Sequence, residues 1–115
     1  MKKIKLKNWP SEPPATVKGI QILAEAASVF FKIPLTELRS RKRTNEIVWP
    51  RAVCMWIARD ANYTSQTVGK WWHRDHGTVL HAVKLVNNLI ETYPKYNDQF
   101  KKFKTFAKEY LKKHL

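Results

Sequence analysis

A short polar run, residues 74–78, carries the side chains best suited to chemistry. It reads Arg-Asp-His-Gly-Thr, so a guanidinium, a carboxylate, an imidazole and a hydroxyl follow one another closely. Groups of these types can hold a metal ion, transfer protons or form directed hydrogen bonds. Their spacing, and the elements that carry them, decide among these uses.

The spacing disfavours catalysis. His73, Asp75 and His76 would be the ligands of a metal-dependent nuclease, but their side chains diverge in a turn that leads into a helix. No further carboxylate or histidine pair at ligand spacing completes the site, and the sequence has no G-x-x-x-x-G-K-[ST] run to cradle phosphates. We therefore expect a protein that is not an enzyme, holds no metal or cofactor and takes no small-molecule substrate.

The arrangement favours directed hydrogen bonding over catalysis, because the polar run lies at the start of a predicted helix. Asp75 is a suitable N-cap. Apolar residues follow at spacings of three and four, namely Val79, Val83, Val86 and Ile90. Residues 64–72 indicate a shorter helix upstream, joined by a tight connection. A short helix, a tight turn and a long helix with a polar front predict a helix-turn-helix.

Positive charge dominates the composition. The 115 residues include 22 Lys and Arg against 9 Asp and Glu, a formal net charge of +13. This excess indicates a polyanionic partner, nucleic acid above all. A membrane is disfavoured, because no apolar run approaches the roughly 20 residues of a spanning helix. The N-terminus lacks the apolar region of a signal peptide, so we expect a cytoplasmic, nucleoid-associated protein.

The apolar spacing predicts an all-α helical bundle in one domain, residues 15–115, after a flexible basic arm of residues 1–14. Helices are expected over residues 15–32, 34–38 and 64–72, from Asp75 to Tyr93, and beyond Pro94. The third helix either begins at Pro50 or starts near residues 45–48 and is kinked there. The single cysteine, Cys54, excludes an intramolecular disulfide and is expected to be buried.

Two further segments carry many cations. Arg39, Arg41, Lys42 and Arg43 lie in a basic loop predicted at residues 39–45, which has no apolar residue to bury and must face solvent or phosphate. The last helix has a Phe-rich apolar face, and lysines occupy the rest of it. We expect that face to pack; a second DNA contact or an acidic membrane are the alternatives.

The RDHGTVLHA run at residues 74–82, with Gly69 and Lys84, resembles the C-terminal DNA-binding domain of DnaA, the bacterial chromosomal replication initiator. The resemblance extends from about Gly19 to about Phe106. It implies a helix-turn-helix preceded by a basic loop, the order already expected from the residues.

The resemblance also implies DNA contacts. Base contacts are expected in the major groove from Asp75, His76 and Gly77, and in the minor groove from Arg43. The phosphate contacts expected from the resemblance and from charge are Arg39, Arg41, Lys42, Arg51, Arg59, Arg74, Thr78 and Lys84. His81 lies off the face of His76, and we expect it to pack or to form a hydrogen bond within the domain.

The sequence departs from the DnaA pattern. Gly77 stands where the family typically carries Thr, so a methyl contact to thymine is missing. The turn at Trp72 and His73 is one residue shorter, which affects sequence preference more than DNA binding. Without the phosphate-binding run, we expect a stand-alone DnaA-like protein that lacks the ATPase module.

We therefore expect sequence-specific binding of double-stranded DNA, in replication initiation or its regulation. A replication initiator or another replication protein is the further partner considered. The alternative is non-specific binding of DNA or RNA, driven by net charge.

Overall fold

The computed structural model describes residues 18–114 of the chain. Within that range the secondary structure is helical with no strand, so the predicted all-α fold is confirmed. The helices are α1 (Lys18–Phe31), α2 (Leu35–Leu38), α3 (Asn45–Asp60), α4 (Ser65–Trp72), α5 (His76–Thr92) and α6 (Pro94–His114). The basic arm expected at residues 1–14 lies outside the described residues.

The start of α3 decides between the two alternatives at Pro50. The helix begins at Asn45, after Thr44 in extended backbone, and Pro50 lies inside it. Proline has no N–H to donate to the carbonyl four residues earlier, so the helix continues through this position with one bond fewer. The early start is therefore the correct alternative.

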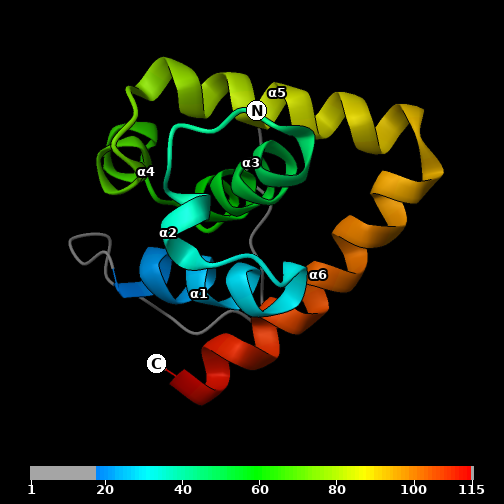
Figure 1. The fold of residues 1–115 in the computed structure, drawn as a ribbon, viewed down its shortest axis with the longest axis horizontal. Helices are drawn as coiled ribbons and strands as arrows, with labels where there is room; N and C mark the ends of the chain where they lie inside the picture. Colours follow the sequence, from blue (N-terminus) through cyan, green and yellow to red (C-terminus); the bar gives the residue numbers. More distant parts are fainter. Residues whose placement is uncertain (1–17, 115) are drawn as a thin grey trace.

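The helices pack around α3, which lies at the centre of the bundle in Figure 1. α3 packs against α1 and α5, α4 packs against α5, and α6 packs against α1 and α5. Trp72 and Phe103 are among the largest fully buried side chains, and Cys54 is buried as expected. Phe100 and Leu111 are also buried, so the expected packing of the last helix is confirmed.

A left-handed residue closes α4 and starts the turn into α5. His73 has φ 58° and ψ 45°, a conformation that residues other than glycine adopt infrequently. The Arg74 N–H then donates to the carbonyl of Gly69 at 2.8 Å. This hydrogen bond satisfies a carbonyl at the end of α4 and directs the chain straight into α5.

Gly69 allows this turn to approach α4 closely. A Cβ at position 69 would lie 2.6 Å from the carbonyl oxygen of Arg74 and 3.1 Å from that of Asp75. Both are backbone atoms of the turn that leads into α5, so neither can rotate aside. The spacing between α4 and α5 therefore requires glycine here.

We expect Gly69→Ala to lower the free energy of unfolding by about 1–3 kcal/mol, because the clash outweighs the better helix propensity of alanine. Denaturant unfolding measures the change. Gly77→Ala is the matched control, since a Cβ there would meet only an Asp75 carboxylate oxygen at 3.5 Å. The control should leave stability equal or raise it by about 0.5–1 kcal/mol. Equal effects of the two substitutions would contradict the close approach.

Candidate nucleic-acid interface

The carboxylate of Asp75 caps α5. Its Oδ1 accepts hydrogen bonds from the backbone N–H of Thr78 at 2.8 Å and from the Thr78 hydroxyl at 2.9 Å. The Thr64 hydroxyl caps α4 in the same way, accepting from the Thr67 N–H at 3.1 Å. Each helix of the predicted helix-turn-helix thus begins at a side-chain cap, which supplies a backbone donor with a partner.

The first turn of α5 projects from the bundle. Residues 75–78, here called the polar front, are all exposed, whereas Val79 directly after them is fully buried. Lys84, farther along α5, is exposed too. The structure thus presents the carboxylate, the imidazole and the hydroxyl to solvent together. The expectation for His81 is wrong, because this side chain is exposed on the outer side of α5.

Hydrogen bonding fixes the charge of the cap. The Thr78 backbone N–H, then the Thr78 hydroxyl, stabilise the carboxylate and lower the pKa of Asp75. Both partners lie within the first turn of α5. The polar front therefore presents an ionised acceptor at neutral pH.

Two arginines join the basic loop to the turn before α5. The carbonyl oxygen of Ser40, in the loop, accepts from Nη2 of Arg74 at 2.7 Å and from Nη2 of Arg51 at 2.9 Å. Arg74 also donates through Nη1 to the Trp72 carbonyl at 3.0 Å. Because one loop carbonyl holds both guanidinium groups, the loop and the polar front keep a fixed relation. We call Ser40, Arg51 and Arg74 the arginine brace.

Arg51 is occupied inside the protein. Its side chain is buried, and besides Ser40 it donates to the carbonyls of Leu38 at 2.8 Å and Lys42 at 3.2 Å. Burial, followed by repulsion from Arg74, lowers the pKa of Arg51. The geometry gives Arg51 the role of holding the loop, in place of the phosphate contact expected from the sequence.

The other cations of this region differ in whether they are hydrogen-bonded to backbone carbonyls or exposed on the loop. Arg39 donates to the Trp71 carbonyl and lies over the Trp71 ring, 4.0 Å from its centroid. Arg59 donates to the Tyr63 carbonyl at 2.9 Å, at the end of α3. By contrast Arg41, Lys42 and Arg43 are exposed on the loop, and Lys42 pairs with Glu37 at 2.9 Å.

The exposed loop arginines lie close enough to the turn to act on it. Burial first, then repulsion from Arg41 and Arg43, lowers the pKa of Arg74. Arg41, Arg43, Arg51 and Arg74 thus form one cationic group beside the polar front. A group of this kind attracts anions, because a phosphate would relieve its internal repulsion.

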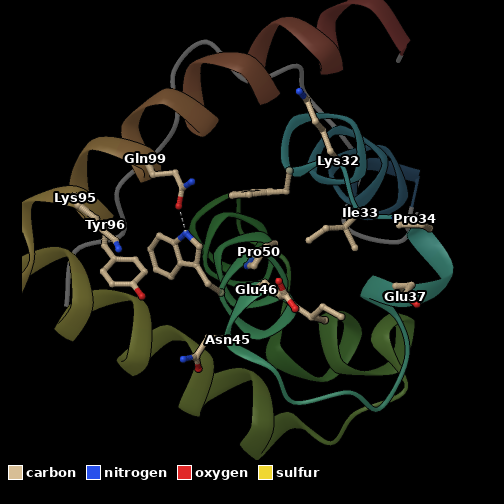
Figure 2. Close-up of a pocket in the computed structure, with 13 residues that line it drawn as sticks. Lys32, Ile33, Pro34, Glu37, Asn45, Glu46, Pro50, Lys95, Tyr96 and Gln99 are labelled. Atoms are coloured by element: carbon tan, nitrogen blue, oxygen red, sulfur yellow. Dashed lines mark hydrogen bonds between the residues drawn. The ribbon is translucent and has the colours of Figure 1, made fainter.

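The cleft shown in Figure 2 lies apart from this region. It has a volume of about 620 Å³ and is lined by residues of the α1–α2 connection and of the starts of α3 and α6. Trp49, on its wall, donates to Gln99 at 2.7 Å. None of the predicted DNA-contacting residues lines it.

The described part of the chain has neither a cluster of metal ligands nor a membrane-spanning helix. Residues 18–114 contain no group of three or more His, Cys, Asp or Glu side chains able to hold a metal ion. In the same range, no helix has the length and apolar character that crossing a membrane requires.

A protein-family model described as the bacterial DnaA protein helix-turn-helix matches residues 20–86. The chain belongs to this family. The match contains the basic loop and the polar front, whereas α6 lies beyond it. Membership of the DnaA helix-turn-helix family supports DNA binding and agrees with a binding domain rather than a catalytic one.

Curated relatives are also DnaA proteins. The chromosomal replication initiator protein DnaA of Thermoanaerobacter sp. (strain X514) is 32% identical over 92 residues, which are 79% of this chain and 21% of that protein. The protein of the same name from Dechloromonas aromatica (strain RCB) is 37% identical over 73 residues, 62% of this chain and 16% of its own length. This chain thus spans about a fifth of the length of the first of these relatives.

We expect Arg51→Lys to lower the free energy of unfolding by about 1–3 kcal/mol, because one ammonium group cannot serve the three carbonyls that the guanidinium holds. Denaturant unfolding measures the change. Arg41→Lys, the same substitution at an exposed loop position, should change stability by less than about 0.5 kcal/mol. A similar small effect at both positions would contradict the brace.

We expect the folded-state pKa of the Asp75 carboxyl, measured by NMR titration, to lie below its ordinary value. Because that pKa is depressed, the stability contributed by the charged cap is present above the ordinary pKa and is lost as pH falls through the lowered pKa. The midpoint of unfolding should fall with it in acid. Asp75→Asn keeps a capping oxygen and should remove this component, and titration of Asp75 at its ordinary value would contradict the cap.

Proposed function

We propose that this chain binds double-stranded DNA sequence-specifically, in replication initiation or its regulation. The polar front at the start of α5 enters the major groove, and Arg43 of the basic loop enters the adjacent minor groove. The observation that carries the proposal is the arginine brace. It ties two exposed groups, each suited to one groove, into a single rigid surface.

The polar front has the chemistry for reading base edges. The Asp75 carboxylate is exposed while its Oδ1 caps the helix, and a carboxylate accepts from the N4 amino group of cytosine while rejecting bases that offer only acceptors. The exposed imidazole of His76 can donate or accept. Gly77 has no side chain to offer, so it allows close approach of the α5 backbone to a base pair.

The basic loop and the rest of α5 supply the sequence-independent part of binding. Arg41, Lys42, Thr78 and Lys84 are exposed and serve as phosphate contacts. The N–H groups of the first turn of α5 add to them. Arg43, in a narrow minor groove, responds to groove width and A·T content rather than to a unique base. Arg51 and Arg74 act mainly by positioning the loop and the polar front, and Arg39 by joining the start of the loop to the Trp71 carbonyl. Arg59, at the end of α3, stays a candidate phosphate contact.

The proposed partner is duplex DNA. The proposed site of action of the protein is the cytoplasm, at the bacterial nucleoid. A replication initiator or another replication protein is a further partner, consistent with the relatives being replication initiators. Non-specific binding of DNA or RNA is the competing function, and the net charge of +13 favours it. The experiment below separates the two.

Selection from random duplex DNA tests the proposal. The wild-type protein should enrich one motif, and Asp75→Asn should relax the preference at one base pair at a cost of about 1–3 kcal/mol. Arg43→Ala should remove a preference for A·T pairs next to that motif. Affinity for the selected duplex, a scrambled duplex and a structured RNA is then compared by fluorescence anisotropy.

Asn88→Ala is the control variant, because Asn88 is exposed on α5 but lies three turns beyond the polar front. It should select the wild-type motif. Circular dichroism and thermal unfolding establish that each variant is folded. Equal affinity for the three nucleic acids, or no enrichment by the wild-type protein, would refute sequence-specific reading and establish binding by charge.

A further inference from the structure

One flank of α6, beside its buried face, carries a stripe of lysines. The residues Lys101, Lys104, Lys108 and Lys112 follow one another at intervals of three or four, so they lie on one side of the helix. The stripe is about 16 Å long at the rise of an α-helix. In all, α6 has seven lysines and only two acidic residues, Asp98 and Glu109. Those two pair with Lys102 and Lys112.

The apolar side of α6 is already used. Phe100, Phe103, Ala107 and Leu111 are buried in the bundle, and Phe103 lies 5.3 Å from the rings of both Phe30 and Phe31. The lysine stripe runs along the edge of this packing. Lys104 is half-buried, with its ammonium group 5.6 Å from the ring centroid of Trp56 and 5.4 Å from that of Phe100, whereas Lys101 and Lys112 are exposed. Repulsion among the ammonium groups of the stripe destabilises the folded protein unless an anion binds nearby.

The stripe lies away from the proposed DNA-reading surface. α6 begins at the far end of α5, about 25 Å along the helix from the polar front. It packs against α1 and α5, whereas the basic loop joins α2 to α3. In Figure 1 α6 descends on the side of the bundle opposite α4. The stripe is therefore a separate cationic surface from the basic loop and the polar front.

The chemistry of the stripe favours duplex phosphate over other polyanions. Insertion into a membrane needs an exposed apolar face, and the large exposed hydrophobic residues of the described chain are Val29, Leu80 and Tyr93, none of them in α6. Single-stranded nucleic acid is held by exposed aromatic rings on which bases stack. Regularly spaced ammonium groups match the charged backbone of a duplex.

We propose that the lysine stripe of α6 binds the phosphate backbone of a second DNA duplex, so that one protein molecule bridges two duplexes. This inference rests on the proposed function for the first duplex. It adds a sequence-independent contact and makes the protein a DNA-bridging module.

The test uses the full chain and two duplexes. One duplex carries the selected motif and is tethered to beads, and a second, labelled duplex of scrambled sequence is in solution. The wild-type protein should retain the second duplex on the beads. Lys101→Gln combined with Lys108→Gln should reduce this retention about tenfold near physiological salt, since two phosphate contacts are lost. Glutamine preserves helix propensity.

Two readouts separate this proposal from the proposed function. Affinity for the selected duplex alone, measured by anisotropy, should change less than about twofold in the stripe variant, because the reading surface is intact. Lys18→Gln combined with Lys32→Gln removes the same charge outside α6 and should bridge like the wild type. Size-exclusion chromatography of the stripe variant and the wild type should give the same molecular size.

Several results would overturn the bridging proposal. The first is a wild-type protein that binds the selected duplex normally but does not retain the second duplex. The second is equal retention of that duplex by the stripe variant and the wild type. The third is an equal loss of retention in the stripe variant and the control variant. Displacement of the second duplex by structured RNA, or by anionic phosphatidylserine vesicles, at lower phosphate concentration than by duplex competitor would also overturn it. Failure of the wild type to bind the tethered motif would instead refute the proposed function.

Discussion

The carbonyl oxygen of Ser40 is the point on which the relative placement of the basic loop and the polar front depends. It accepts from guanidinium groups that belong to different elements, Arg51 in α3 and Arg74 in the turn before α5. Charged donors make stronger hydrogen bonds than neutral ones, and a shared acceptor fixes both donors relative to the loop. A basic loop that would otherwise sample many conformations is thereby held against the start of α5.

This arrangement concentrates like charges. Burial and mutual repulsion lower the pKa values of Arg51 and Arg74, which means that bringing these cations together opposes folding. The opposing free energy is offset by the hydrogen bonds to loop carbonyls. Any phosphate that binds beside the loop reduces the repulsion. Binding of a polyanion therefore stabilises the folded protein. A charged site of this kind trades some stability of the free protein for affinity.

The sequence predicted what local chemistry determines. The capping role of Asp75, the exposure of residues 75–78 and the burial of Cys54 follow from residue type and spacing, and the structure agrees. The brace could not be predicted, because a lone arginine in a basic protein is assumed to face solvent and backbone carbonyls leave no mark in a sequence. His81 was misplaced for a related reason. Its neighbour Ala82 is buried while Leu80 is exposed, and only the rotation of α5 in the structure shows that His81 lies on the exposed side with Leu80.

The junction of α5 and α6 has a mechanical consequence. Tyr93 is the single residue between the two helices, and Pro94 at the start of α6 restricts the backbone before it. A joint with so few free torsions transmits motion rather than absorbing it. Because α6 also packs on α1, the angle between α5 and α6 is held at both the junction and the packed face, so the two helices form one stiff corner of the bundle.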